Sequence, residues 1–215
     1  FGTAGTGGFA IKNAGIGAYS SACQTIITIF MFLFGMNFNF YFLLLVRKFK
    51  QAFLEEIRWY FIIFTSAAII ITINISQYFE NIWEALHHAT FQTASIMSST
   101  GFATADFNTW PGLSRYILIL LMFIGACAGS TGGGFKVSRL IILLKSYLSE
   151  ITGLVYSGSV QTIRLNGKKV DNDTIRRTGM FFFGFIAILT LSSALLCLDD
   201  FGLTENFTAS LSAIS

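Results

Sequence analysis

The sequence has 215 residues, of which 53% are hydrophobic and 12% are charged, and it contains 24 Phe but a single Pro. An ordinary soluble domain has about a quarter charged residues, so this composition excludes a typical soluble protein. The net charge of +3 is too small to indicate a nucleic-acid partner, and we expect an integral membrane protein.

Long uncharged runs predict membrane-spanning helices. A helix needs about 20 predominantly apolar residues to cross the hydrocarbon core of a bilayer. One such run also fits the buried core of a soluble protein, but several in one short chain favour the membrane. The runs are Asn13 to Val46, Trp59 to Phe79, Tyr116 to Phe135 and Thr178 to Leu198.

The basic residues predict which side of the membrane each connection faces. All of the 14 Lys and Arg residues except Lys12 and Arg115 lie between the first and second runs or between the third and fourth. Because cytoplasmic loops carry the excess of Lys and Arg, these two connections are expected to face the cytoplasm. Asp106, Asp199 and Asp200 are then expected on the outer side.

The segment Glu80 to Pro111 is predicted to enter the membrane and return without crossing it. It begins and ends on the outer side, and it is richer in Thr, Ser, Gln and His than a lipid-facing span. We expect Asn81 or Glu80 to cap a short helix that runs to about Met97. The chain would then return in extended backbone, which at membrane depth is tolerated only within protein or along a water-filled cavity.

A glycine-centred loop occurs twice. "GTAGTGGFAIKN" opens the chain, and "SIMSSTGFATADF" follows the predicted re-entrant helix. Each loop is followed by a polar turn, a long apolar run and a basic stretch, so the repeat extends beyond the loop itself. Glycine allows successive carbonyl groups to point one way, and rings of carbonyls replace the water around a dehydrated cation. The predicted ion-binding residues are Thr6, Gly7, Gly8, Ser99, Thr100 and Gly101.

The third apolar run holds a dense group of glycines, "GACAGSTGGGFK", from Gly125 to Lys136. Each glycine costs about 1 kcal/mol relative to alanine in a helix interior. Small residues also permit close helix packing, but three consecutive glycines exceed what packing needs and favour a break in the span. The spacing does not fit a phosphate-binding loop, so we expect no nucleotide here.

The two loops, together with "GACAGSTGGGFKVSRL", resemble the membrane subunit of the Trk/Ktr/HKT superfamily of potassium transporters, and the bacterial Trk type in particular. The resemblance covers essentially the whole chain, and "AGSTGGGFK" is its most specific part. It implies an all-α integral membrane protein with repeated units, each comprising an M1 helix, a pore helix, a filter loop and an M2 helix. Such units form a pseudo-fourfold pore resembling a potassium channel. The implied function is potassium uptake across the cytoplasmic (inner) membrane, and not enzymatic catalysis.

By this resemblance the chain divides into four parts. Residues 1–50 would be the end of the second pore unit, and residues 51–148 a complete third unit. Residues 149–177 would form a cytoplasmic connection with a hairpin, and residues 178–215 the start of the fourth unit. The first and fourth filters would then lie outside the chain, which alone could not close a pore.

The resemblance also implies a gate, a substrate and partners. The glycine-rich break would be an intramembrane loop that blocks the pore on its cytoplasmic side. The potassium ion would be the substrate, with no covalent cofactor; Gly8 and Gly101 favour potassium because Ser at this position marks sodium carriers in the wider family. The expected partners are membrane lipid, a second copy in a homodimer, and a cytoplasmic nucleotide-binding regulatory subunit. The gate residues would be Ala128, Gly129, Ser130, Thr131, Gly132, Gly133 and Gly134.

The remaining titratable residues have mostly structural interpretations. His87 and His88 are adjacent and point to different sides of a helix, which favours polar residues of a pore helix over metal ligands. Asp106 either concentrates cations at the entrance or is a solvated loop residue. Lys136 is interpreted as a cytoplasmic anchor in preference to a group at the inner mouth. The three cysteines lie in apolar runs and are expected to pack there, without forming disulfides.

Thr162 to Val170 predicts a β-hairpin on the cytoplasmic side. Asn166-Gly167 between alternating apolar arms is typical of a type I′ turn, and Asp171 or Asp173 is expected to cap the next helix. The hairpin would either dock a cytoplasmic partner or simply connect two spans.

Other functions stay open at this stage. A non-selective or sodium-conducting cation transporter fits the same loops. A membrane assembly protein or an intramembrane enzyme fits less well, because an enzyme needs an acid pair, a nucleophile or a metal cluster at membrane depth. The apolar runs contain no Asp or Glu.

Overall fold

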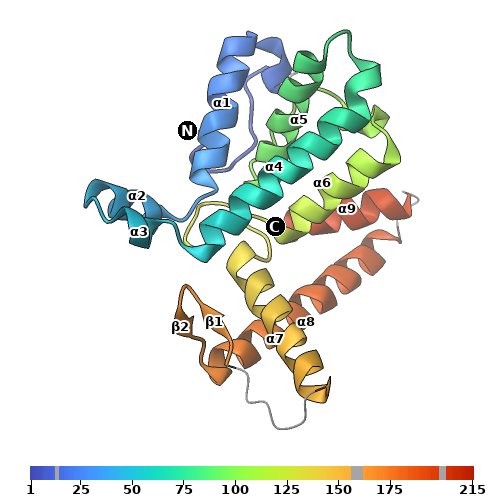
Figure 1. The fold of residues 1–215 in the computed structure, drawn as a ribbon. Coiled ribbons are helices and arrows are strands. Elements are labelled where there is room, and N and C mark those ends of the chain that lie inside the picture. The colour runs from blue at the N-terminus through green and yellow to red at the C-terminus, as the bar shows by residue number, and fades with distance from the viewer. Residues whose placement is uncertain (13–14, 156–161, 199–201) are drawn as a thin grey trace.

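The computed structural model describes residues 1–12, 15–155, 162–198 and 202–215. Asp199 and Asp200, which the sequence predicts on the outer side, lie outside these residues. The regular elements of the described residues are helices, apart from one small β-hairpin (Figure 1). In chain order the elements are η1 (Gly15–Ala18), α1 (Ser21–Phe34), α2 (Phe38–Leu45), α3 (Phe49–Ala52), α4 (Glu55–Ile75), η2 (Ser76–Tyr78), α5 (Ile82–Met97), η3 (Phe107–Thr109), α6 (Gly112–Ile124), α7 (Val137–Val155), β1 (Arg164–Leu165), β2 (Lys168–Lys169), α8 (Asn172–Leu196) and α9 (Leu203–Ile214).

Helices α4, with its η2 extension, and α8 are long and apolar enough to cross a membrane. Their outward faces carry exposed apolar side chains, among them Ile62, Ile69, Phe183 and Leu191. Lipid contact accounts for such faces, since helices that are hydrophobic all round suit a membrane span. Helices α1 and α2 pass the same test only as a bent pair.

The first apolar run, Asn13 to Val46, which the sequence predicts to span the membrane, contains a sharp bend in the structure. Helices α1 and α2 meet at an angle of 91°. A side chain at Gly35 would collide with the hydroxyl of Tyr60, and that hydroxyl donates to the Phe32 carbonyl at 3.0 Å. The Asn37 side chain then caps the new helix by accepting from the Asn39 N–H at 2.9 Å. The break therefore depends on a packing partner from α4 as well as on a local capping residue.

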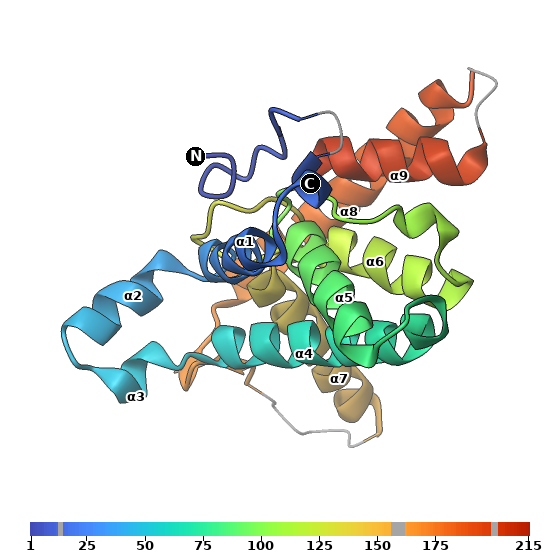
Figure 2. The same ribbon diagram turned by 90° about the horizontal axis from the view of Figure 1, so that it is seen from above.

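Helix α5 lies between α1 and α6 and packs against α4, in the upper part of Figure 1 and in the middle of Figure 2. It begins after Asn81 and ends at Met97, as the sequence predicts, although the Asn81 side chain makes no capping hydrogen bond. Every residue from Phe91 to Met97 is buried, including three polar ones. A short helix surrounded by protein fits the predicted re-entrant segment, because its polar groups and its end need partners within the protein.

The hairpin lies at the same end of the molecule as α7 and near the start of α4 (Figure 1). Its turn residues Asn166 and Gly167 have φ of +54° and +76°, the signs that a type I′ turn requires. The Asn166 side chain accepts from the Glu55 N–H at 2.6 Å. Lys145 of α7 pairs with Glu55 at 2.5 Å and donates to the Arg164 carbonyl at 2.8 Å. The hairpin is thus attached to two helices.

Of the two predicted caps for α8, Asp171 occupies the N-cap position but makes no side-chain capping bond. Asp173 lies in the first turn and pairs with Arg176 and Arg177, each at 2.8 Å. These exposed pairs contribute little to stability. The Phe-rich start of α8 packs against Phe123 and Phe135, so part of it is core and not lipid-facing surface.

Candidate functional site

The two glycine-centred loops share one backbone pattern. In the first loop Thr6 and Gly8 have φ of +48° and +66°, and in the second Ser99 and Gly101 have φ of +58° and +80°. The residue between each pair does not have positive φ, so the sign alternates along both loops at equivalent positions. Alternation turns successive carbonyl groups toward the same side, whereas carbonyls of a regular strand alternate in direction. Thr6 and Ser99 are in the left-handed region, which residues other than glycine rarely adopt.

The loops also lie side by side. A Cβ atom added to Gly8 would be 2.4 Å from the Thr100 carbonyl oxygen. Farther along, a Cβ atom on Gly17 of η1 would be 3.1 Å from the Thr104 carbonyl oxygen. The two copies of the repeat, about a hundred residues apart in the chain, are therefore neighbours along their length.

Helix α5 holds the second loop through polar side chains. The Ser95 carbonyl accepts from the Thr100 N–H at 2.9 Å, and the Ser95 hydroxyl donates to the Phe102 carbonyl at 2.6 Å. One turn earlier, the Gln92 amide donates to the Ala105 carbonyl at 3.1 Å. Sequence reasoning missed the roles of Ser95 and Gln92. Their spacing of three residues, which places both on one helix face, was the available signal.

His87 and His88 have separate partners, as their adjacency predicts. His87 Nε2 lies 2.8 Å from the Gln24 side-chain oxygen of α1, and His88 Nδ1 lies 3.0 Å from the Thr104 hydroxyl. Within the described ranges no cluster of three metal-ligating side chains occurs. The histidines join α1 and the segment that follows the second glycine-centred loop to the first half of α5.

The glycine-rich run interrupts its span. Helix α6 ends at Ile124 and α7 begins at Val137, with non-helical backbone between them. Gly125, Gly129 and Gly134 have positive φ, which glycine adopts without strain. A Cβ atom on Gly125 would be 2.5 Å from the Gly133 carbonyl oxygen. The loop therefore folds back on itself, so that its two ends touch backbone to backbone.

This loop contacts both glycine-centred loops and the end of α9. The Thr6 hydroxyl donates to the Thr131 carbonyl at 3.3 Å, and the Gly133 N–H donates to the Ser99 hydroxyl at 3.2 Å. The Gly134 N–H donates to the Ser215 carbonyl at 3.0 Å. The predicted ion-binding and gate residues thus form one contiguous set. Figure 1 shows its position at the centre of the molecule, near the C-terminal label.

The structure gives local partners to two charged residues, and only Lys136 differs from the interpretation that the sequence favours. The Lys136 ammonium turns back to the Gly132 carbonyl, so it lies at the loop and is not a free cytoplasmic anchor. The Asp106 carboxylate accepts from the Asn108 N–H at 2.9 Å and caps the short helix η3. Cys127 is buried within the glycine-rich run, and no disulfide joins the cysteines of the described chain.

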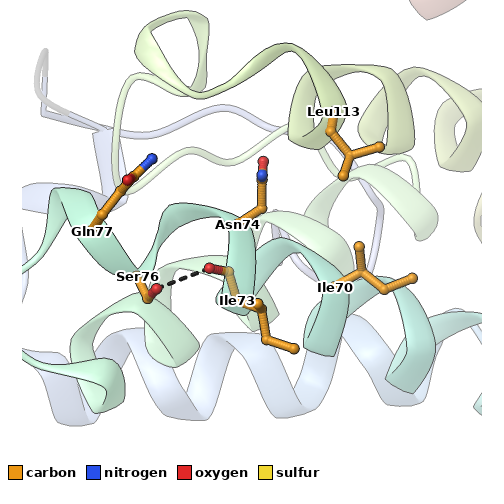
Figure 3. A pocket seen from close by; sticks show the side chains of 6 residues that line it. All are labelled: Ile70, Ile73, Asn74, Ser76, Gln77 and Leu113. Atoms are coloured by element: carbon orange, nitrogen blue, oxygen red, sulfur yellow. Dashed lines mark hydrogen bonds between the residues drawn. The ribbon is translucent and has the colours of Figure 1, made fainter.

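A surface pocket lies elsewhere, between the end of α4 and the start of α6 (Figure 3). Its six lining residues carry no charge, and they are Ile70, Ile73, Asn74, Ser76, Gln77 and Leu113. Asn74 accepts from the Ser114 hydroxyl at 2.7 Å, which ties the two helices together beside the pocket. None of the ion-binding or gate residues lines it.

A family model described as a cation transport protein, TrkH, matches residues 1–215. The chain belongs to this family. The TrkH family consists of membrane transport proteins and not of enzymes. As a member of this family, the chain belongs to a multi-pass protein of the cell inner membrane.

Similarity to named relatives supports the assignment. The chain is 30% identical over 195 residues to the Trk system potassium uptake protein TrkH of Halomonas elongata, covering 89% of this chain and 40% of that protein. It is 28% identical over 219 residues to TrkH of Escherichia coli K12, covering 98% of this chain and 45% of that protein. The chain thus spans less than half the length of these relatives.

The fold matches a solved structure. The crystal structure of the potassium transporter TrkH from Vibrio parahaemolyticus superposes with a TM-score of 0.90 at 26% sequence identity. The match covers 98% of this chain and 47% of that chain. The all-α membrane fold expected from the sequence is therefore confirmed.

Proposed function

We propose that the protein containing this chain takes up potassium ions, and that its two glycine-centred loops bind the dehydrated ion through backbone carbonyls. The observation that carries this proposal is the alternating sign of φ at equivalent positions of both loops. The same geometry in two copies, side by side, suits a ring of carbonyls around a permeation path. The relatives, described as Trk system potassium uptake proteins, supply the identity of the ion.

A ring of this kind needs more than two loops. The chain provides two, and we propose that further units of the same protein complete a pseudo-fourfold pore. The binding groups would be the carbonyls at Thr6, Gly7, Gly8, Ser99, Thr100 and Gly101. Because carbonyls substitute for the hydration shell, no covalent chemistry is involved, and potassium is substrate, not cofactor.

The second part of the proposal is that the loop from Ala128 to Gly134 is the gate. This loop contacts Thr6 and Ser99 of the two glycine-centred loops, so we place it directly below the proposed ion path. Its backbone is not held by helical hydrogen bonds, and glycine gives it several arrangements close in energy. Lys136 adds a positive charge beside the loop, which opposes a cation on the same path. A modest free energy is then enough to shift the loop between closed and open arrangements.

We further propose that a cytoplasmic nucleotide-binding subunit supplies this free energy and that the protein forms a homodimer. Helix α7 continues directly from the gate loop and carries Lys145, which contacts the hairpin. A partner bound to α7 or to the hairpin would therefore pull on the lower end of the loop. This connection supports a regulator on the cytoplasmic side.

Deletion of residues 129–133 in the complete protein tests the gate. We expect the shortened protein to insert normally, to conduct potassium faster, and to depend less on its regulator. Flux is measured in reconstituted vesicles with and without regulator, and Gly153→Ala serves as a control, because a Cβ atom there meets nothing within 4 Å. Unchanged flux and regulation after deletion would show that the loop is only a packing element. Sodium flux equal to potassium flux in the parent protein would instead favour a non-selective cation transporter.

A further inference from the structure

The first turn of α4 contains a carboxylate that is almost completely buried. Glu56 is 4% exposed, whereas acidic residues are rarely buried unless their oxygens have partners. One of its oxygens accepts from the Ala128 N–H at 2.6 Å. A hydrogen bond to an ionised carboxylate is about twice as strong as a neutral one.

The same carboxylate reaches the other end of the gate loop. Ser138 lies beside it, close enough for the side chain and the backbone N–H of that residue to favour its charged form. Ser138 lies in the first turn of α7, where the backbone N–H groups of a helix have no partners within the helix. A negative charge is favourable at this position. One side chain therefore binds the residue at which the loop begins and the helix that follows the loop.

A third contact joins Glu56 to the break between α1 and α2. The Asn37 side chain lies beside the carboxylate and favours its charged form. The next residue, Phe38, donates its N–H to the Gly129 carbonyl at 3.1 Å, and the Cys127 N–H donates to the Gly35 carbonyl at 3.0 Å. Two interrupted spans thus face one another, and Glu56 contacts both.

We propose that Glu56 is a positioning residue that holds the gate loop in its closed arrangement. The inference rests on the proposed function of that loop as a gate. A carboxylate provides acceptors for several N–H and O–H groups at once, and no neutral side chain of similar size does the same. When the loop opens, the Ala128 N–H leaves Glu56, so the free energy of these hydrogen bonds is part of the barrier that a regulator has to overcome.

The neighbouring acidic residue provides a matched control. Glu55 lies in the same turn, but it pairs with Lys145, and its N–H is bonded to Asn166 of the hairpin. Glu55→Gln therefore removes a charge from the same turn of α4 without touching the loop. A general effect of negative charge at the start of α4 would appear in both variants, and a specific one only at Glu56.

Cys127 serves as the reporter of loop position, because it is buried beside Ala128. The other cysteines of the complete protein are replaced by Ala, and the rate of modification by an impermeant thiol reagent is measured from the cytoplasmic side. We expect Glu56→Ala to raise this rate about tenfold or more, the effect of losing a charge-assisted hydrogen bond. Glu56→Gln keeps one acceptor and should fall between Glu56→Ala and the parent, while Glu55→Gln should match the parent.

Flux measurements separate this inference from the proposed function. Faster modification of Cys127 in Glu56→Ala, together with greater regulator-independent potassium flux and unchanged selectivity over sodium, supports both the role of Glu56 and the loop as gate. A higher rate at Cys127 with parental flux supports the role of Glu56 and contradicts the loop as gate. Parental protection of Cys127 in Glu56→Ala would overturn the inference. If Glu56→Ala fails to insert, Ser138→Ala takes its place, because it removes only one neighbour of the carboxylate. The inference is then contradicted if Cys127 is modified at the parental rate in both Ser138→Ala and Glu56→Gln.

Discussion

Gly8→Ala should damage ion selectivity more than Gly101→Ala, although the two glycines occupy equivalent positions in their loops. Both have positive φ, at +66° and +80°, and an L side chain there costs roughly 1–2 kcal/mol. Their surroundings differ. A Cβ atom on Gly8 would lie 2.4 Å from the Thr100 carbonyl oxygen, whereas the nearest atom to a Cβ on Gly101 is the Gly8 Cα at 3.9 Å.

The difference sets the size of the effect. A contact of 2.4 Å has to lengthen by about 1 Å before it is ordinary, so one of the two loops must shift. Overpacking of this kind costs about 1–3 kcal/mol. With the backbone strain added, Gly8→Ala costs about 2–5 kcal/mol and Gly101→Ala about 1–2 kcal/mol. Because the atom that is pushed is a carbonyl proposed to bind the ion, a substitution in one loop disturbs the other.

The assay is the ratio of potassium to sodium flux in vesicles containing the complete protein. Gly7→Ala is the control, since Gly7 does not have positive φ and its added Cβ would meet only the ring of Phe9, at 3.4 Å. We expect the ratio to be close to the parent in Gly7→Ala, lower in Gly101→Ala and lowest in Gly8→Ala. Equal ratios in the last two variants would refute the side-by-side placement of the loops.

Two further experiments test the support of the filter and the topology. Ser95→Ala removes the hydroxyl that donates to the Phe102 carbonyl at 2.6 Å, and a buried acceptor without its partner costs about 1–3 kcal/mol. We expect this variant to have lower selectivity for potassium and unchanged regulation. Selectivity equal to that of the parent would show that this hydrogen bond does not shape the proposed filter. A cysteine introduced as Lys168→Cys, in the exposed strand β2, should react with an impermeant reagent only from the cytoplasmic side; labelling from outside intact cells would contradict the orientation of the whole chain.

Features governed by local backbone preference could be predicted from the sequence. The bounds of α5, the type I′ turn of the hairpin and the interruption after Ile124 all follow from residues within a few positions of the feature. Glycine and asparagine have backbone preferences that do not depend on the rest of the chain. The membrane class likewise follows from composition, which needs no three-dimensional information.

Features that depend on contacts between distant segments could not be predicted. The bend after α1 is such a case, because Gly35 has no unusual neighbours in sequence and the need for a glycine arises from Tyr60 on α4. Ser95 and Gln92 are similar, since their hydroxyl and amide groups look like ordinary polar residues of a re-entrant helix until the returning chain supplies the carbonyls that they bind.

Glu56 shows the limit most clearly. In the sequence it is one charge among several in a cytoplasmic connection, where the natural interpretation is a solvated side chain near the membrane surface. It is buried because α4 begins beside two broken spans, and one of them donates the Ala128 N–H to its carboxylate. A break in a membrane helix releases backbone donors that lipid cannot satisfy, so a polar side chain has to be supplied from elsewhere in the protein. Each predicted break in a span therefore implies partners that the sequence does not identify, and in this chain Glu56 is the charged partner of the glycine-rich break.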